Sequence, residues 1–172
     1  MEKGAFRRVI TESAHEFAAA LADGGVLLGL DPGTKTVGVA TCDAGWRFAT
    51  AGKTLPRGKF GALKTALGEL CGQRQVTGMV LGLPRNMDGS EGPRAQAARA
   101  LARNLDQAFG LPVLLWDERL STMGAERAMI EQDMSRARRA ERIDSHAAAI
   151  ILQAALDAMT QGGLDQGPIP CR

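Results

Sequence analysis

Tyrosine is missing from this sequence of 172 residues, and its only other aromatic residues are two tryptophans and five phenylalanines. So few aromatic side chains cannot form a broad platform on which bases stack. If the protein binds nucleic acid, we therefore expect it to recognise backbone shape, together with partner molecules, and to have weak base specificity.

Cysteine and histidine are scarce as well. Cys42, Cys71 and Cys171 are far apart and lack the spacing of metal ligands, and His15 and His146 are the only histidines. A zinc site or a disulfide framework is therefore not expected.

Long hydrophobic runs and a strong charge bias are also absent. No apolar stretch approaches the roughly 20 residues of a membrane helix. Residues 1–25 mix acidic and basic residues through the apolar positions, without the continuous apolar region of an export signal. We expect a cytoplasmic protein that does not contact membranes. The formal net charge of +2 means that any surface for nucleic acid must be local.

The order of the predicted elements favours one α/β domain with a mixed sheet and helices on both faces. Apolar runs predict strands over residues 26–30, 37–40, 46–54, 76–83 and 113–116. Helical periodicity predicts helices over residues 14–21, 60–72, 90–109, from about 122, and from 144 to about 160. We divide the chain into an N-terminal extension with a short helix (residues 1–25), a main domain (26–161) and a flexible tail (162–172).

One carboxylate stands out in the hairpin LLGLDPGTKTVGVA, residues 27–40. Asp31 ends an apolar run that is typical of a strand buried on both faces, and a buried carboxylate must be paired, hydrogen-bonded or bound to a cation. Pro32 and Gly33 supply the turn. A simpler interpretation is that Asp31 only caps this turn.

A second unusual acid, Glu118, directly follows the strand VLLW, residues 113–116. Ligands bind at the carboxyl ends of parallel strands in open α/β sheets, so Glu118 is placed where a site is expected. Asp117 points to the opposite face if the strand continues that far. The alternative is that both are ordinary charges at a strand end.

The third acid is Asp144. It lies at helical spacing before Ala148, Ile151, Leu152 and Ala155, so it shares the apolar face of the last helix. An Asp in the first turn of a helix is also stabilised by the helix dipole without any further role. Convergence with the other two acids is the interpretation we favour.

Three carboxylates without histidine or cysteine form a hard oxygen site that suits Mg²⁺ or Mn²⁺. Two such cations serve phosphoryl transfer, including the hydrolysis of phosphodiesters. The sequence therefore predicts a two-metal site in which Asp31, Glu118 and Asp144 are both metal ligands and catalytic residues.

Polar and basic residues in the segments around these acids are candidates to hold a substrate. Each one alone is more simply a solvated surface residue, and only their clustering favours a role. The candidates are Lys35 in the hairpin turn, Asn86 and Arg94 around the loop of residues 84–92, Arg119, and Arg136, Arg138 and Arg139 in a basic segment (135–142) before the last helix; Arg85 and Arg142 are further basic residues of these segments.

Four blocks together resemble the YqgF (RuvX) family of nucleases of the RNase H-like superfamily. They are GLDPGTKTVGVA, GLPRNMDGSEGPRA, DERLST and DSHAAAIILQAALD, and they span about residues 26–160 in the order typical of the family. The resemblance implies an RNase H-like five-stranded sheet whose second strand is antiparallel. It also implies a metal site formed by the three acids. The N-terminal extension and the tail lie outside the pattern.

The resemblance further implies a function in maturing the 5′ end of the small-subunit ribosomal RNA precursor, with precursor RNA and the ribosomal particle as partners. The resolution of Holliday junctions in DNA is the alternative within the family and is less expected, because symmetric junction cutting needs paired sites and we expect a monomer or weak dimer. A non-catalytic RNA-binding ribosome-assembly factor is another alternative. A phosphate loop like that of the actin and sugar-kinase superfamily is disfavoured, since the chain is too short for a second domain.

Overall fold

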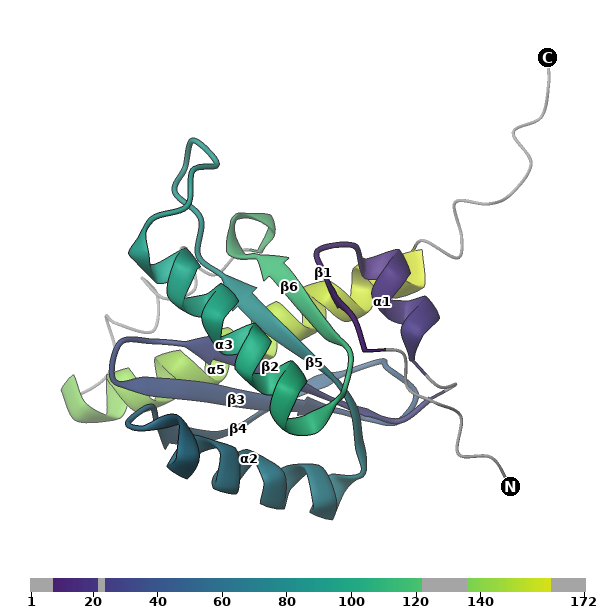
Figure 1. Cartoon of the computed structure of the whole chain (residues 1–172), viewed down its shortest axis with the longest axis horizontal. Helices are drawn as coiled ribbons and strands as arrows, with labels where there is room; N and C mark the ends of the chain where they lie inside the picture. The colour runs from purple at the N-terminus through teal and green to yellow at the C-terminus, as the bar shows by residue number, and fades with distance from the viewer. Residues whose placement is uncertain (1–7, 22–23, 122–135, 162–172) are drawn as a thin grey trace.

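The computed structural model describes residues 8–21, 24–121 and 136–161, with the backbone alone for 136–144 (Figure 1). The elements are, in order, β1 (Ile10–Thr11), α1 (Ala14–Ala20), β2 (Val26–Pro32), β3 (Thr36–Cys42), β4 (Ala49–Pro56), α2 (Phe60–Arg74), β5 (Val76–Leu83), α3 (Pro93–Phe109), β6 (Val113–Asp117), a short 3₁₀ helix η1 (Glu118–Leu120) and α5 (Arg136–Gln161). No helix in these ranges is both long and apolar enough to span a membrane.

The sheet has the order β1-β6-β5-β2-β3-β4. β2, β5 and β6 run parallel, whereas β3 is antiparallel to both β2 and β4. The five strands from β2 to β6 therefore have the expected RNase H-like arrangement with an antiparallel second strand. The predicted mixed α/β fold is confirmed.

Each face of the sheet is covered by helices, so most central strand residues are buried on both sides. Leu28, Leu30, Met79 and Leu81 belong to the core formed with α2 and α3. Residues at the alternate positions, such as Leu27, belong to a second core formed with α1 and α5. This explains why these strands appear in the sequence as unbroken apolar runs.

Helix α5 lies directly on β2 because the strand has a glycine at the crossing point. A Cβ atom at Gly29 would lie 2.7 Å from the Cβ of Leu152 and 2.8 Å from the carbonyl oxygen of Ala148. Only a residue without a side chain allows this approach. Asp31 lies two residues further along β2, and residue 144 lies one helical turn before Ala148.

The N-terminal extension is integrated into this fold. β1 adds a sixth strand parallel to β6, and the side chain of Phe17 on α1 is fully buried against the second core. The N-cap of α1 is Ser13, and the Thr11 hydroxyl donates to Glu16 at 2.6 Å. The extension with its short helix is thus packed against the sheet.

Several element boundaries differ from those expected. β4 begins at Ala49 rather than Trp46, which adopts a positive φ in the preceding turn. α3 begins at Pro93 after the N-cap Gly92 rather than at residue 90, and α5 begins at Arg136 rather than at residue 144, so it includes most of the basic segment. Gly110 ends α3 in the left-handed conformation, as expected. The helix expected from residue 122 and the tail lie outside the described residues.

Candidate active site

One edge of the sheet collects most of the predicted site. β2, β5 and β6 end there, and because β3 and β4 are antiparallel in turn, β3 begins there and β4 ends there. The hairpin turn after β2, the loop of residues 84–92 after β5 and η1 after β6 therefore meet at this edge, to the left and top in Figure 1.

Asp31 is a buried carboxylate at this edge, with 1% of its surface exposed. Asp31 is two and four residues after Gly29 and Leu27 on β2, so the three residues share the face of the sheet that α5 covers. The turn that follows is closed by a hydrogen bond of 2.8 Å from the Gly33 amide to the carbonyl of Thr36. A backbone hydrogen bond therefore closes this turn.

Glu118 lies on the same side of the sheet. Its Oε1 atom is 2.7 Å from the position that a Cβ atom of Gly82 would take. Gly82 follows Leu81, the partner of Leu30, by one residue, so it is the neighbour of Asp31 on the adjacent strand. Neighbouring strands lie about 4.8 Å apart, so the fold brings Asp31 and Glu118 together over one glycine.

Asp117 has different surroundings, as strand alternation predicts. It accepts hydrogen bonds from the Arg119 amide at 3.0 Å and from the Arg119 guanidinium at 2.7 Å, and it contacts Arg85 at 3.4 Å. These bonds, with Arg119 as the largest influence, lower the pKa of Asp117. Asp117 is therefore part of an ion-pair network, whereas Glu118 lies against Gly82.

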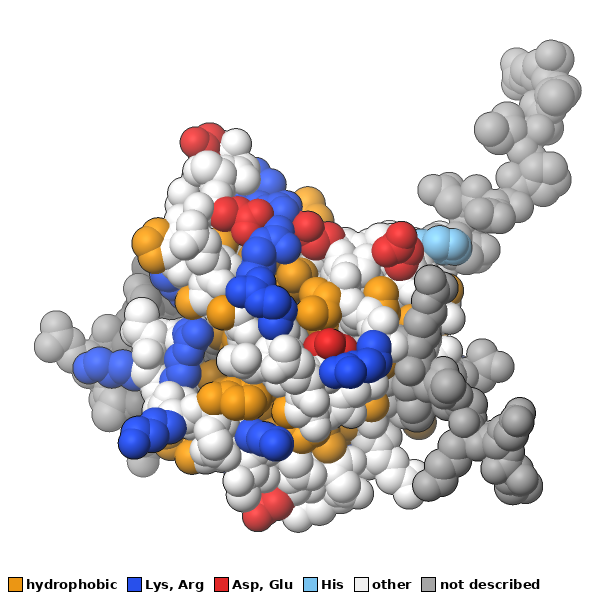
Figure 2. Space-filling model, viewed as in Figure 1, with side chains coloured by type: hydrophobic (Ala, Val, Ile, Leu, Met, Phe, Trp, Pro, Cys, Tyr) orange, Lys and Arg blue, Asp and Glu red, His pale blue; other side chains and the backbone are white. Residues whose placement is uncertain are grey.

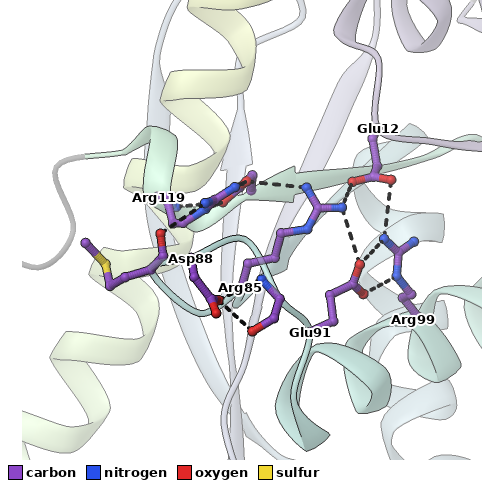
Figure 3. A network of polar contacts seen from close by, with 9 residues as sticks. Glu12, Arg85, Asp88, Glu91, Arg99 and Arg119 are labelled. Carbon is purple, nitrogen blue, oxygen red and sulfur yellow. Dashed lines mark hydrogen bonds and ion pairs between the residues drawn. The ribbon is translucent and has the colours of Figure 1, made fainter.

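The rest of this network joins the N-terminal segment to α3 (Figure 3). Arg85 contacts both Glu12 and Glu91, and Arg99 on α3 contacts the same two carboxylates. Hydrogen bonds from Arg99 lower the pKa of Glu91 to about 2, despite a smaller opposing effect of desolvation. Arg85 thus has three acidic neighbours, counting Asp117, and is a structural cation.

Asn86 shapes the loop of residues 84–92. Its amide donates to the Ser90 carbonyl at 2.9 Å, and its side-chain Nδ2 donates to the Ser90 hydroxyl at 2.9 Å. Ser90 in turn binds Asp88, and Arg119 reaches the Met87 carbonyl at 3.5 Å. Bonds to Ser90 lower the pKa of Asp88 most, with a small contribution from Arg119. The Asn86 side chain, which we predicted to contact the substrate, is already bonded to Ser90 within its own loop.

The predicted basic residues fall into three groups. Lys35 and Arg94 are exposed, with no ion pair among the described residues. Arg119 is held by Asp117, so its charge is largely compensated. The side chains of Arg136, Arg138 and Arg139, like that of Asp144, lie outside the described residues.

One basic residue at this edge was missed by the sequence analysis. Arg57 directly follows β4, and its backbone and side chain both donate hydrogen bonds to the hairpin turn after Asp31. The available signal was its position immediately after a strand, the same signal that singled out Glu118.

Asp31 and Glu118 have the donor chemistry of a site for a hard cation. Both offer carboxylate oxygens at one sheet edge, and Gly82 leaves the space between them free of a side chain. Among the side chains that the structure describes, no group of three or more His, Cys, Asp or Glu residues is placed to hold a metal. The predicted site of Asp31, Glu118 and Asp144 remains a prediction, because the Asp144 side chain lies outside the described residues.

Comparison with known proteins adds an independent result. A family model described as "RuvX: Holliday junction resolvase" matches residues 25–158. A protein from Novosphingobium aromaticivorans is 65% identical over 151 residues, covering 88% of this chain and 97% of the relative. One from Sphingopyxis alaskensis is 62% identical over 153 residues, covering 89% and 100%. Both are named "Putative pre-16S rRNA nuclease".

A solved structure, "T. thermophilus RuvC in complex with Holliday junction substrate", covers 80% of this chain and 96% of its own, with 16% identity and a TM-score of 0.49. The family match spans most of the chain and includes both described acids, Asp31 and Glu118. The chain belongs to the RuvX family.

Proposed function

We propose that the protein is a metal-dependent nuclease that hydrolyses phosphodiester bonds in the precursor of the small-subunit ribosomal RNA. The observation that carries the proposal is the pairing of two carboxylates from different strands, Asp31 and Glu118, over Gly82 at the ligand-binding edge of the sheet. Carboxylate oxygens at the carboxyl ends of parallel strands are ligands that a hard cation such as Mg²⁺ prefers.

In this proposal, Asp31, Glu118 and Asp144 hold Mg²⁺ or Mn²⁺. The cation, when bound, lowers the pKa of water and stabilises the charge that develops on the phosphate oxygens. The protein's own residues supply position: β2 and η1 fix two carboxylates, and α5 crosses β2 at Gly29 and brings residue 144 toward the same edge. Hydrolysis then joins a water oxygen to phosphorus, breaks one P–O ester bond and releases a proton.

The relatives' names favour RNA over DNA as the substrate. We infer a single RNA strand at the 5′ side of the mature sequence, recognised through its backbone in the cytoplasm, as naked RNA or within a ribosomal particle. The family description, which names Holliday junctions, is the alternative. Symmetric junction cutting requires two sites at a fixed spacing on a dimer, whereas a single strand needs one site.

The test compares wild-type protein with Asp31→Asn, Glu118→Gln and Asp144→Asn on labelled precursor ribosomal RNA and on a mobile four-way DNA junction. We expect Mg²⁺- or Mn²⁺-dependent cleavage of the RNA by the wild type and loss of at least 100-fold in each variant. Symmetric nicks in the junction that depend on Asp31, with the RNA intact, would favour the resolvase. RNA binding without cleavage of either substrate would favour a non-catalytic assembly factor.

A further inference from the structure

The arginines near the active-site edge differ in whether a carboxylate compensates them. Arg85, Arg99 and Arg119 each form ion pairs with Glu or Asp side chains. Arg57 forms no ion pair with any residue that the structure describes, although it lies at the same edge. A guanidinium that no described carboxylate compensates can bind an anion such as a phosphate.

Arg57 is held in place by the hairpin turn that follows Asp31. Its amide donates to the Lys35 carbonyl at 2.9 Å, and its Nη1 atom donates to the Gly33 carbonyl. The guanidinium has five N–H donors, and its bond to Gly33 uses one of them, so other donors can bind a phosphate. Its partner in the turn is a neutral carbonyl, so no carboxylate of the described residues compensates its positive charge.

Lys35 adds a second cation to this turn. Its side chain is exposed, and its carbonyl is the group that Arg57 binds. Figure 2 shows separate Lys and Arg side chains at the left of the molecule, where Figure 1 places the β2–β3 turn and the start of α2, whereas acidic and basic side chains are mixed near the top. Among the described side chains, positive charge is therefore paired with carboxylates on the β6 side of the edge, whereas Arg57 and Lys35 at the turn form no ion pair.

We propose that Arg57 and Lys35 form a phosphate clamp that holds the backbone of the RNA strand beside Asp31. The inference rests on the proposed nuclease function and adds a binding residue to it. The turn begins two residues after Asp31, so a phosphate held there lies close to the carboxylate. Arg119 is not part of the clamp, because Asp117 already occupies its guanidinium.

The clamp is tested by the salt dependence of RNA binding. We measure the affinity for a single-stranded RNA of about 15 nucleotides in Ca²⁺, by fluorescence anisotropy, over a range of KCl concentrations. Each phosphate contact contributes about 0.7 to the slope of log K against log salt for a single strand. Arg57→Gln should lower the slope by about 0.7, and Arg57→Gln with Lys35→Gln by about 1.4.

Arg74→Gln is the matched control. It removes the same charge from an exposed side chain in the last turn of α2, at the far end of that helix from Arg57. Its slope should equal that of the wild type. Arg57→Lys keeps the charge and should retain the slope while weakening affinity severalfold, because the fork that binds carbonyl and phosphate together is lost.

An Arg57→Gln slope equal to that of Arg74→Gln would overturn the clamp. A thermal melt shows whether Arg57→Gln folds. If it does not, Lys35→Gln alone tests the clamp, because no hydrogen bond among the described residues of the turn involves the Lys35 side chain. Its salt slope should fall by about 0.7. Cleavage of RNA is recorded separately. A protein that binds with the expected slopes but never cleaves would refute the nuclease and leave the clamp standing.

Discussion

Single glycines decide how closely the acids of the candidate site approach. Gly82 is the position at which Glu118 from η1 and Ile151 from α5 meet the sheet, and both would lie within 3 Å of an added Cβ atom. The sequence indicates only that glycine permits close approach. Which side chain uses the space is a property of the folded chain.

Gly82→Ala should therefore displace the Glu118 carboxylate. We expect a loss of about 1–3 kcal/mol in the free energy of unfolding from overpacking, together with a large fall in kcat for RNA cleavage. Chemical denaturation and single-turnover kinetics measure the two effects. Gly61→Ala is the control, because nothing lies within 4 Å of its Cβ position in α2, and it should raise stability by about 0.5–1 kcal/mol. Unchanged activity in Gly82→Ala would argue against a role for Glu118.

Ion pairs set the response of single residues to acid. The pKa of Glu91 falls from its ordinary value of 4.5 to about 2 in the folded protein, first of all because Arg99 binds it. The folded state thus binds this proton more weakly than the unfolded state. The stability that Glu91 contributes is complete above about pH 4.5 and is lost as the pH falls toward 2.

Glu91→Gln should accordingly flatten the acid side of the stability curve. Urea denaturation at pH 7, 4 and 3 should show a smaller difference in unfolding free energy between wild type and variant as the pH falls. The control is Glu69→Gln, an exposed residue of α2 that makes no ion pair within the described residues. A gap between wild type and Glu91→Gln that is constant with pH would show that Arg99 does not hold the carboxylate ionised.

At the scale of elements, the N-terminal segment is the main surprise. Its helix was predicted from amphipathic spacing, but its partners were not. Phe17 fills a space over Gly78, where an added Cβ would lie 3.0 Å from its ring, and Glu12 reaches Arg85 and Arg99. α1 and the Glu12 ion pairs thus connect the beginning of the chain to the loop beside the candidate site.

Phe17→Ala should destabilise the whole domain by about 3–5 kcal/mol, as expected for a fully buried phenylalanine. Phe48→Ala is the matched control, since the Phe48 side chain is 72% exposed and its removal should change stability by less than about 0.5 kcal/mol. Thermal and urea unfolding measure both. Equal small effects would mean that α1 folds as an appendage and not as part of the core.

At the scale of the whole molecule, the sheet edge gathers acids from separate parts of the chain. In the proposed metal site, repulsion among Asp31, Glu118 and Asp144 would disfavour the state without the cation, and a cation that binds only the folded protein would stabilise it. This coupling makes global stability a readout of the site that is independent of cleavage.

Mn²⁺ at 100 times its dissociation constant should therefore stabilise the wild type by about 2.7 kcal/mol. Asp31→Asn should gain little from Mn²⁺ and should equal or exceed the wild type in stability in EDTA, because neutralising one acid relieves repulsion. Differential scanning calorimetry measures the melting temperatures. Glu69→Gln should respond to Mn²⁺ as the wild type does. An Asp31→Asn protein stabilised as strongly as the wild type would place the cation elsewhere.

The sequence by itself determined the features that depend on local pattern. Apolar runs located the five strands from β2 to β6, and glycine located the end of α3 at Gly110. The pattern also singled out two candidate site residues: Asp31 as a carboxylate at the end of an apolar strand, and Glu118 by its position directly after one. The start of α3 was less well predicted, because Ser90 is bonded to Asn86 within the loop and the helix begins only at Pro93.

Only the tertiary structure decided which charges are compensated. Arg85 and Arg119 look like free cations in the sequence, and Arg57 attracts no attention. Folding pairs Arg85 with Glu12, which is 73 positions away, pairs Arg119 with Asp117, and leaves Arg57 beside a neutral carbonyl at the turn. Ion pairing depends on distances of a few ångströms between residues remote in sequence, and no local pattern contains those distances.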